Sequence, residues 1–143
     1  MEIAGRSVLV TGAAHRVGKG IALAFAEAGA DLVLHYNRSA REAEQTAEEA
    51  RALGASVVLR QADLRNLESI SELLPEPVDS LVNSAAGFPS DHVLDVTPEQ
   101  WGETLAVNPS APVFLAQAFA RALPEDRGGV VVNITDWKTE RPY

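Results

Sequence analysis

The residues with the clearest chemical potential form a glycine-rich segment, Thr11–Gly20. It lies between the short apolar run Ser7–Thr11 and the helical pattern Ile21–Ala28. A glycine-rich turn between a strand and a helix lets backbone N–H groups approach a pyrophosphate at the helix N-terminus. The segment therefore predicts a phosphate-binding loop, and an ordinary structural turn is the alternative.

Basic residues follow the second apolar run of the chain. Domains that bind NAD carry a carboxylate there for the ribose 2′-hydroxyl, whereas an arginine accommodates a 2′-phosphate. The segment His35–Ser39 has no carboxylate; its Arg38 can bind a phosphate through two parallel hydrogen bonds, and Ser39 can donate another. We expect Arg38 to converge with Arg16 and Lys19 on one edge of this acidic protein, and a solvated surface position is the alternative for Arg38.

The elements that must position these residues follow from five apolar runs that alternate with helical patterns. The runs predict buried strands at Ser7–Thr11, Asp31–Tyr36, Ser56–Arg60, Val78–Asn83 and Val130–Thr135. Strands that alternate with helices form a parallel sheet with helices on both faces. We predict an α/β fold, a Rossmann-type doubly wound parallel sheet of strand order 3-2-1-4-5, with its ligand beyond the carboxyl ends of the strands.

The helical patterns carry start and stop signals. We expect helices over Ile21–Ala28, from Ser39 to Gly54, over roughly 66–74, and from Thr97 to Leu123 with a break near Asn108–Pro109. Ser39 with Glu42 and Thr97 with Gln100 predict capping boxes. The apolar face of the first helix comprises Ile21, Ala24, Phe25 and Ala28.

Composition bounds the class of protein. The chain has 143 residues, 46% of them apolar, no cysteine and a net charge of −8, which suits one domain with a substantial core. The absence of cysteine excludes disulfide scaffolds and thiol nucleophiles and favours a cytoplasmic protein. An acidic chain is a poor nucleic-acid binder, and no apolar run is long enough to span a membrane. Its three histidines, at 15, 35 and 92, are too scattered to predict a metal site.

The phosphate loop narrows these possibilities. Thr11–Gly20 resembles the Thr-Gly-x-x-x-Gly-x-Gly loop of the short-chain dehydrogenase/reductase superfamily, with Arg16 in place of the middle glycine. Within that superfamily, this loop and the string His-Tyr-x-Arg-Ser at 35–39 are most similar to the pteridine reductase group. The resemblance implies NADP(H) as the cofactor. It assigns cofactor binding to Gly12, His15, Arg16, Val17, Gly18, Arg38 and Ser39.

Further segments match the same superfamily in order. After the third apolar run, Asp63 and Leu64 resemble the pair that holds the adenine. After the fourth run, Asn83-Ser84-Ala85-Ala86-Gly87 resembles the Asn-Asn-Ala-Gly motif that lines the cofactor, and the resemblance assigns cofactor contacts to Asn83, Ser84 and Ala85. Asn108 falls where the family has an asparagine that bonds a water of the proton relay, which implies a catalytic role.

Two positions point to the substrate. Asp136 stands where most short-chain reductases have a catalytic serine. Pteridine reductases also have an aspartate there, which implies that Asp136 bonds a protonated pterin nitrogen and takes part in catalysis. Phe88 falls where that group has a phenylalanine that stacks on the pterin ring. A turn aspartate and a core or lid phenylalanine are the alternatives.

The resemblance covers the N-terminal part of such an enzyme, because the Tyr-x-x-x-Lys motif expected after Asp136 is absent. We expect residues 1–143 to be a single dinucleotide-binding domain, without the catalytic dyad and the C-terminal strands and inactive by itself. The implied function is NADPH-dependent reduction of a pteridine-like or carbonyl substrate. A 3-oxoacyl or sugar ketoreductase and a non-catalytic NADP-binding module are the alternatives. The family also implies a homo-oligomer, a dimer or tetramer, formed through the helix near Asn108.

Overall fold

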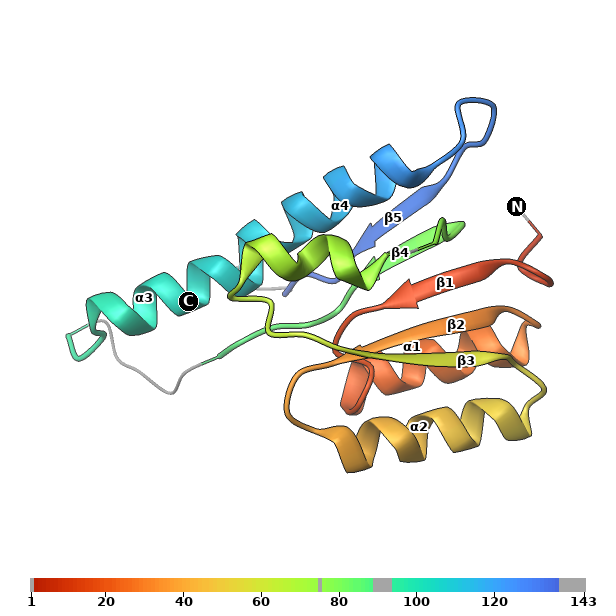
Figure 1. Cartoon of the computed structure of the whole chain (residues 1–143). Coiled ribbons are helices and arrows are strands. Elements are labelled where there is room, and N and C mark those ends of the chain that lie inside the picture. The colour runs from red at the N-terminus through yellow and green to blue at the C-terminus, as the bar shows by residue number, and fades with distance from the viewer. Residues whose placement is uncertain (1, 75, 89–93, 137–143) are drawn as a thin grey trace.

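A five-stranded parallel sheet with the order β3-β2-β1-β4-β5 forms the centre of the protein (Figure 1). The structure is a computed structural model that describes residues 2–74, 76–88 and 94–136. The strands are β1 (Ser7–Val10), β2 (Asp31–Tyr36), β3 (Val57–Gln61), β4 (Ser80–Asn83) and β5 (Val130–Asn133). The predicted fold class and strand order are confirmed, and the strand bounds agree to within about two residues.

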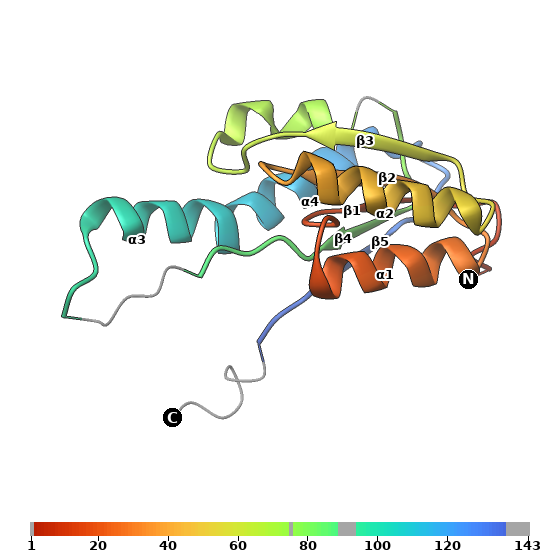
Figure 2. The same ribbon diagram turned by 90° about the horizontal axis from the view of Figure 1, so that it is seen from below.

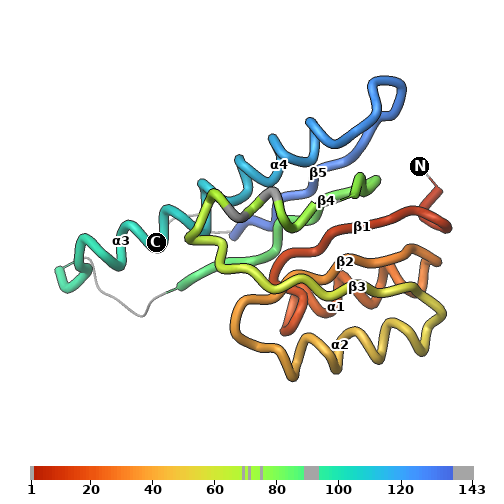
Figure 3. Tube along the Cα trace, in the orientation of Figure 1, coloured from red at the N-terminus to blue at the C-terminus, as the bar shows by residue number. Residues whose placement is uncertain are grey.

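Helices cover both faces of this sheet (Figure 2). On one face lie α1 (Arg16–Glu27) and α2 (Ala40–Ala52), and on the other lie the 3₁₀ helix η1 (Leu67–Leu73) and α4 (Ala111–Ala122). After β3 the chain crosses back through η1, which brings β4 beside β1 (Figure 3). Beyond the carboxyl ends of the strands, α3 (Pro98–Leu105) continues into α4 through a π-helical turn, η2 (Ala106–Ser110).

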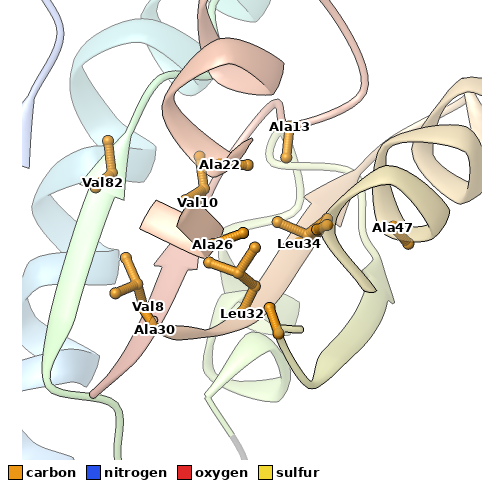
Figure 4. Packing of buried hydrophobic residues seen from close by; sticks show 12 residues of the cluster. Val8, Val10, Ala13, Ala22, Ala26, Ala30, Leu32, Leu34, Ala47 and Val82 are labelled. Carbon is orange, nitrogen blue, oxygen red and sulfur yellow. The ribbon is translucent and has the colours of Figure 1, made fainter. Parts of the chain in front are cut away.

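Small residues bring α1 close to the sheet. Its buried positions are Gly18, Ala22 and Ala26, spaced four apart, so they lie on one side of the helix. Figure 4 shows Ala22 and Ala26 packed over the side chains of Val8 and Val10 on β1. The predicted apolar face is therefore wrong in its register. Ala24 and Ala28 are exposed, while Ile21 and Phe25 pack only at the margin of this cluster.

Several other element predictions need correction. The first helix begins at Arg16 rather than Ile21, and the segment expected to be α-helical near 66–74 is a 3₁₀ helix. The break near Asn108–Pro109 takes the form of a π-turn with Pro109 inside it, since proline removes one donor from the α-helical ladder. The capping box at Thr97 is confirmed, because its Oγ1 accepts from Gln100 N and Gln100 Oε1 accepts from Thr97 N.

The prediction that all five strands are buried is wrong for the two edge strands, because no residue of β3 is buried, with Val58 45% exposed, and β5 is exposed along its length. Val130, Val131 and Val132 are each more than a third exposed. Among the described residues β5 pairs only with β4, so it is an edge strand of the sheet. Within the same residues, no helix combines the length and the apolar character needed to cross a membrane.

A buried carboxylate joins the strands at the end of the sheet where β1 and β4 begin. Asp79 is 4% exposed and accepts hydrogen bonds from Ser7 N at 2.9 Å and from Arg6 at 3.1 Å. Arg127, just before β5, also donates to it. Burial raises the pKa of the Asp79 carboxyl, but the bonds from Ser7, Arg127 and Arg6 outweigh this and hold the pKa below its ordinary value.

We expect Asp79→Asn to lower the free energy of unfolding by about 2–3 kcal/mol at neutral pH, because it removes charged hydrogen bonds from a buried site. Since the folded pKa is depressed, the stabilisation is complete above the unfolded pKa of about 3.9 and is lost as the pH falls towards the lower folded value. Urea unfolding at pH 7 and pH 3 measures both effects. Asp126→Asn, at an exposed loop position, is the matched control. Equal losses of stability at the two pH values would contradict this account.

Candidate functional site

A cleft of about 720 Å³ opens at the carboxyl ends of β1, β2, β4 and β5. In doubly wound sheets this edge is the usual place for a ligand. The cleft is lined by Gly12, Ala14, His15, Arg16, Val17, Gly18, His35, Asn37, Arg38, Ser39, Asp63, Leu64, Arg65, Ser84, Ala85, Ala86, Gly87, Phe88, Val107, Ile134, Thr135 and Asp136. All predicted site residues except Asn83 and Asn108 are among these described lining residues.

Two glycines give the loop between β1 and α1 its tight shape. Gly12 has a φ of +67°, and a Cβ there would lie 2.8 Å from Ala85 Cα. A Cβ on Gly18 would overlap the carbonyl oxygen of Gly12 and lie 2.9 Å from its carbonyl carbon. The start of α1 therefore rests directly on the loop backbone. The first N–H groups of a helix have no intrahelical acceptors, and the first-turn residues Arg16, Val17 and Gly18 line the cleft.

Arg16 holds a backbone conformation that favours glycine. Its φ of +47° is the one positive value at a non-glycine residue among those described. A side chain in the left-handed region costs about 1–2 kcal/mol. The positive φ explains why the related loop pattern has glycine at the same place. The exposed Arg16 side chain lines the cleft.

Thr11 joins this loop to the segment after β4. Its Oγ1 is buried and accepts hydrogen bonds from Ser84 N and Ala85 N, both at 3.0 Å. The backbone of Ser84 and Ala85 is therefore fixed beside Gly12 as one wall of the cleft. A threonine between a buried strand and a glycine is the sequence signal for this contact.

The turn after β2 carries the second predicted group of residues. Arg38 is exposed and lines the cleft together with Ser39. The Ser39 hydroxyl lies 2.9 Å from His15 Nε2 and makes no capping hydrogen bond to α2, so the capping box predicted with Glu42 is wrong.

The predicted convergence of Arg16, Lys19 and Arg38 on one edge is also wrong in part. Lys19 pairs with Glu49 at 2.8 Å and does not belong to the described cleft lining, whereas Arg16 and Arg38 do.

The segment after β3 presents an acidic side chain with a fixed charge. Asp63 accepts from Arg65 Nε at 3.0 Å and from Arg65 N at 3.0 Å. The hydrogen bonds from the Arg65 side chain are the largest effect on the pKa of Asp63 and outweigh that of burial. Together with the Arg65 backbone N–H they lower this pKa to about 2. Arg65 also pairs with Glu103 on α3. Asp63 is therefore a permanent acceptor at the cleft, with Leu64 buried beside it.

Phe88 and Asp136 lie at the same cleft from different segments. Phe88 follows β4 and is 78% exposed, so its ring is accessible to a flat ligand at the predicted substrate site. Asp136 follows β5 and is also exposed. The cleft thus combines a glycine loop, an arginine, an acceptor, an aromatic ring and a second acid. No cluster of three or more potential metal ligands occurs among the described residues, and His92 lies outside them.

Comparison with known sequences agrees with this geometry. Residues 6–143 match the model of the short chain dehydrogenase family. The chain belongs to the short-chain dehydrogenase family. The chain is 35% identical over 134 residues to versicolorin reductase 1 of Aspergillus parasiticus, covering 90% of this chain and 50% of that protein. It thus spans about half the length of the curated relatives that it matches.

Two solved structures superpose closely on this one. FolM alternative dihydrofolate reductase 1 of Brucella canis, complexed with NADP, gives a TM-score of 0.90 at 35% identity and covers 99% of this chain and 58% of that one. A short chain dehydrogenase of Burkholderia cenocepacia in complex with NADP gives a TM-score of 0.93 at 30% identity. It covers 100% of this chain and 60% of that one.

Two asparagines predicted from the family motifs do not belong to the described cleft lining, and both have structural partners. Asn83 is buried, and its Nδ2 donates to Asn133 Oδ1 at 2.8 Å, which joins the ends of β4 and β5. Asn108, in the π-turn, accepts from Gly87 N at 2.8 Å and donates to Gly87 O at 2.9 Å. The Asn108 side chain therefore fixes the backbone at Gly87, and the Asn83 side chain joins two strand ends through Asn133. Neither asparagine is part of the described cleft lining.

Three residues in or near the cleft were not predicted. Arg65 was missed although the string Asp63-Leu64-Arg65 places an opposite charge two residues from the acid. Asn133 was missed although β4 and β5 both end in asparagine and the two residues pair in register. His35 was not assigned to the site although it begins the His-Tyr-x-Arg-Ser string at 35–39.

Proposed function

We propose that the protein is an NADP(H)-dependent reductase whose substrate is a pteridine. The observation that carries the proposal is Asp136, a carboxylate in the cleft that the glycine loop and Arg38 also line. A neutral carbonyl substrate calls for a hydroxyl donor at such a place, whereas a ring nitrogen that carries a proton calls for a carboxylate. Asp136 therefore supports a substrate with a protonated ring nitrogen.

The residues of the cleft fit a dinucleotide with a 2′-phosphate. The backbone at Gly12 and Gly18 leaves no room for side chains, which suits close approach of a pyrophosphate. Arg38 and Ser39 would hold the 2′-phosphate, and Asp63 would accept from the adenine amino group. When bound, NADPH supplies a hydride. The protein's part is to orient the cofactor and substrate and to exclude water from the space between them.

Asp136 and Phe88 would hold the substrate ring. A carboxylate at Asp136 can accept a charge-assisted hydrogen bond from a protonated ring nitrogen, and this fixes both the position and the protonation state of the ring. The exposed face of Phe88 offers a stacking partner for a flat heterocycle. Together they would present one face of the substrate to the cofactor.

The relatives support this proposal to different degrees. The Brucella canis protein is named as an alternative dihydrofolate reductase, and dihydrofolate contains a pteridine ring. The match to a versicolorin reductase favours a second candidate, a short-chain reductase that acts on a different substrate class. In that case Asp136 would have no direct role in substrate binding.

Asp136→Ser in the full-length protein distinguishes the two candidates. We expect kcat/KM for dihydrobiopterin or dihydrofolate to fall about 10- to 100-fold, because a charged hydrogen bond contributes about 1.5–3 kcal/mol. Reduction of a simple ketone should change far less. The two activities are followed at 340 nm beside melting temperature. Parallel losses on both substrates, with a lower melting temperature, would favour a structural aspartate and the second candidate.

We also propose a cytoplasmic homo-oligomer. Apolar side chains on α3 and α4 support association through these helices, because Trp101, Leu105, Val113 and Phe114 are all exposed in the single chain. Exposed apolar groups of this size on neighbouring turns are typical of protein interfaces.

A further inference from the structure

The ring of His35 is the one imidazole buried in the described part of the chain. It is 2% exposed and lies at the end of β2, one residue before Tyr36. Its Nδ1 is 3.3 Å from Gly12 N, in the phosphate loop, and its Nε2 is 3.1 Å from Ala62 O, just after β3. A single buried side chain therefore contacts both segments that the proposed cofactor needs.

The partners of the ring determine its proton. A backbone N–H only donates, so Gly12 requires a bare Nδ1, and a carbonyl only accepts, so Ala62 requires a protonated Nε2. Desolvation lowers the pKa of His35, against smaller opposing effects of the Ala62 hydrogen bond and the Asp63 charge, which favours the neutral ring. The main chain of His35 also joins the phosphate loop to β2, because His35 O accepts from Ala13 N at 3.0 Å.

The contacts link two parts of the cleft that are separate in sequence. Gly12 begins the turn on which the start of α1 rests, and Ala62 directly precedes Asp63. We propose that His35 is a positioning residue for the cofactor, holding the phosphate loop and the adenine-side acceptor at a fixed separation through Gly12 and Ala62. The inference rests on the proposed NADP(H) dependence and assigns a role to a residue that does not itself bind the phosphates.

An apolar side chain at position 35 would fill the space of the imidazole but could not hydrogen-bond to Gly12 or Ala62. Val33, two positions earlier on the same face of β2, packs against the apolar cluster beneath η1 and α4. A leucine at 35 would remove the hydrogen-bond partner of the part-buried Gly12 N–H and that of the buried Ala62 carbonyl. The loop would then shift to find water or another acceptor, and cofactor affinity would fall.

NADPH titration of the full-length protein, followed by calorimetry, tests the inference with three substitutions at one position. His35→Leu removes both contacts and should weaken NADPH binding by about tenfold or more. His35→Asn keeps an acceptor at the δ position for Gly12 and should recover most of the affinity. His35→Gln keeps a donor towards Ala62 but not the δ acceptor, so it should resemble the leucine variant. Val33→Ala is the matched control, which should lower the melting temperature without changing NADPH affinity.

The outcomes separate this inference from the proposed function. No NADPH binding by the unmodified protein would overturn the proposed function. If the unmodified protein binds NADPH and His35→Leu binds it with equal affinity, the positioning role alone is overturned. The same holds if the NADPH affinity of His35→Asn is no higher than that of His35→Gln. Should His35→Leu not fold, the ¹⁵N chemical shifts of the His35 ring in the unmodified protein decide. A proton on Nδ1 at pH 7 would overturn the inference, and a bare Nδ1 with a protonated Nε2 would support it.

Discussion

Gly18→Ala is expected to weaken NADPH binding by about 10- to 100-fold, which corresponds to the roughly 1–3 kcal/mol cost of forcing a group into a packed site. The added methyl would overlap the carbonyl oxygen of Gly12 and lie 3.3 Å from Ala13 Cα. These are backbone atoms, so no side-chain rotation relieves the overlap. Gly12 has no room to retreat, because Ala85 lies behind it. The helix and the loop must therefore separate at the point where a pyrophosphate would bind.

Gly20→Ala is the matched control for this experiment. Gly20 lies two residues further along α1, and a Cβ there would meet nothing within 4 Å. Alanine is the better helix former by about 1 kcal/mol, so Gly20→Ala should keep or raise the melting temperature and leave NADPH affinity unchanged. Equal NADPH affinities in Gly18→Ala and Gly20→Ala would contradict the assignment of this loop to the phosphates.

Arg38→Asp is expected to reverse the preference between the two nicotinamide cofactors. In the unmodified protein we expect NADPH to bind more tightly than NADH, because Arg38 and Ser39 lie together at the cleft with no carboxylate in the same turn. Loss of the charged hydrogen bonds from Arg38 should weaken NADPH binding by about 10- to 100-fold. The new carboxylate would repel a 2′-phosphate and can accept from the 2′-hydroxyl of NADH.

Fluorescence titration with both cofactors measures this change. Arg41→Asp introduces the same change of charge three residues later on α2, at an exposed position outside the described cleft lining. It should leave the ratio of the two affinities unaltered. Equal affinities of the unmodified protein for NADPH and NADH would contradict the assignment of Arg38 to a 2′-phosphate.

Local patterns in the sequence predict most of this architecture. Buried parallel strands appear as short continuous apolar runs, and the glycine loop between β1 and α1 is recognisable because its conformation depends on glycine at Gly12 and Gly18. Arg38 could be assigned to a ligand site because it follows a strand at the carboxyl edge of the sheet, whereas Phe88 and Asp136 were assigned through the resemblance to pteridine reductases.

The features that the sequence did not reveal depend on contacts between distant segments. Ser39 has the sequence of a helix cap, but His15 engages its hydroxyl from another loop. Valines in β5 look the same whether or not a neighbour covers them, so their exposure was not predictable. In α1, Gly18 and Ala22 are small and contribute little to an apolar pattern. The prediction followed the larger side chains of Ile21 and Phe25 and therefore placed the buried face wrongly.

The central place of β1 has a consequence for the order in which the protein folds. The hydrogen bond from Gly12 to His35 joins residues 23 positions apart, whereas those from Ser84 and Ala85 to Thr11 span 73 and 74. Closing the longer loop costs about 1 kcal/mol more in chain entropy, and its residues leave the ribosome later. The β1–α1–β2 unit can therefore form first, with the loop tied only to β2. The second wall of the cleft forms when β4 pairs with β1, so a nascent chain completes the binding loop only after synthesis has passed Ala85.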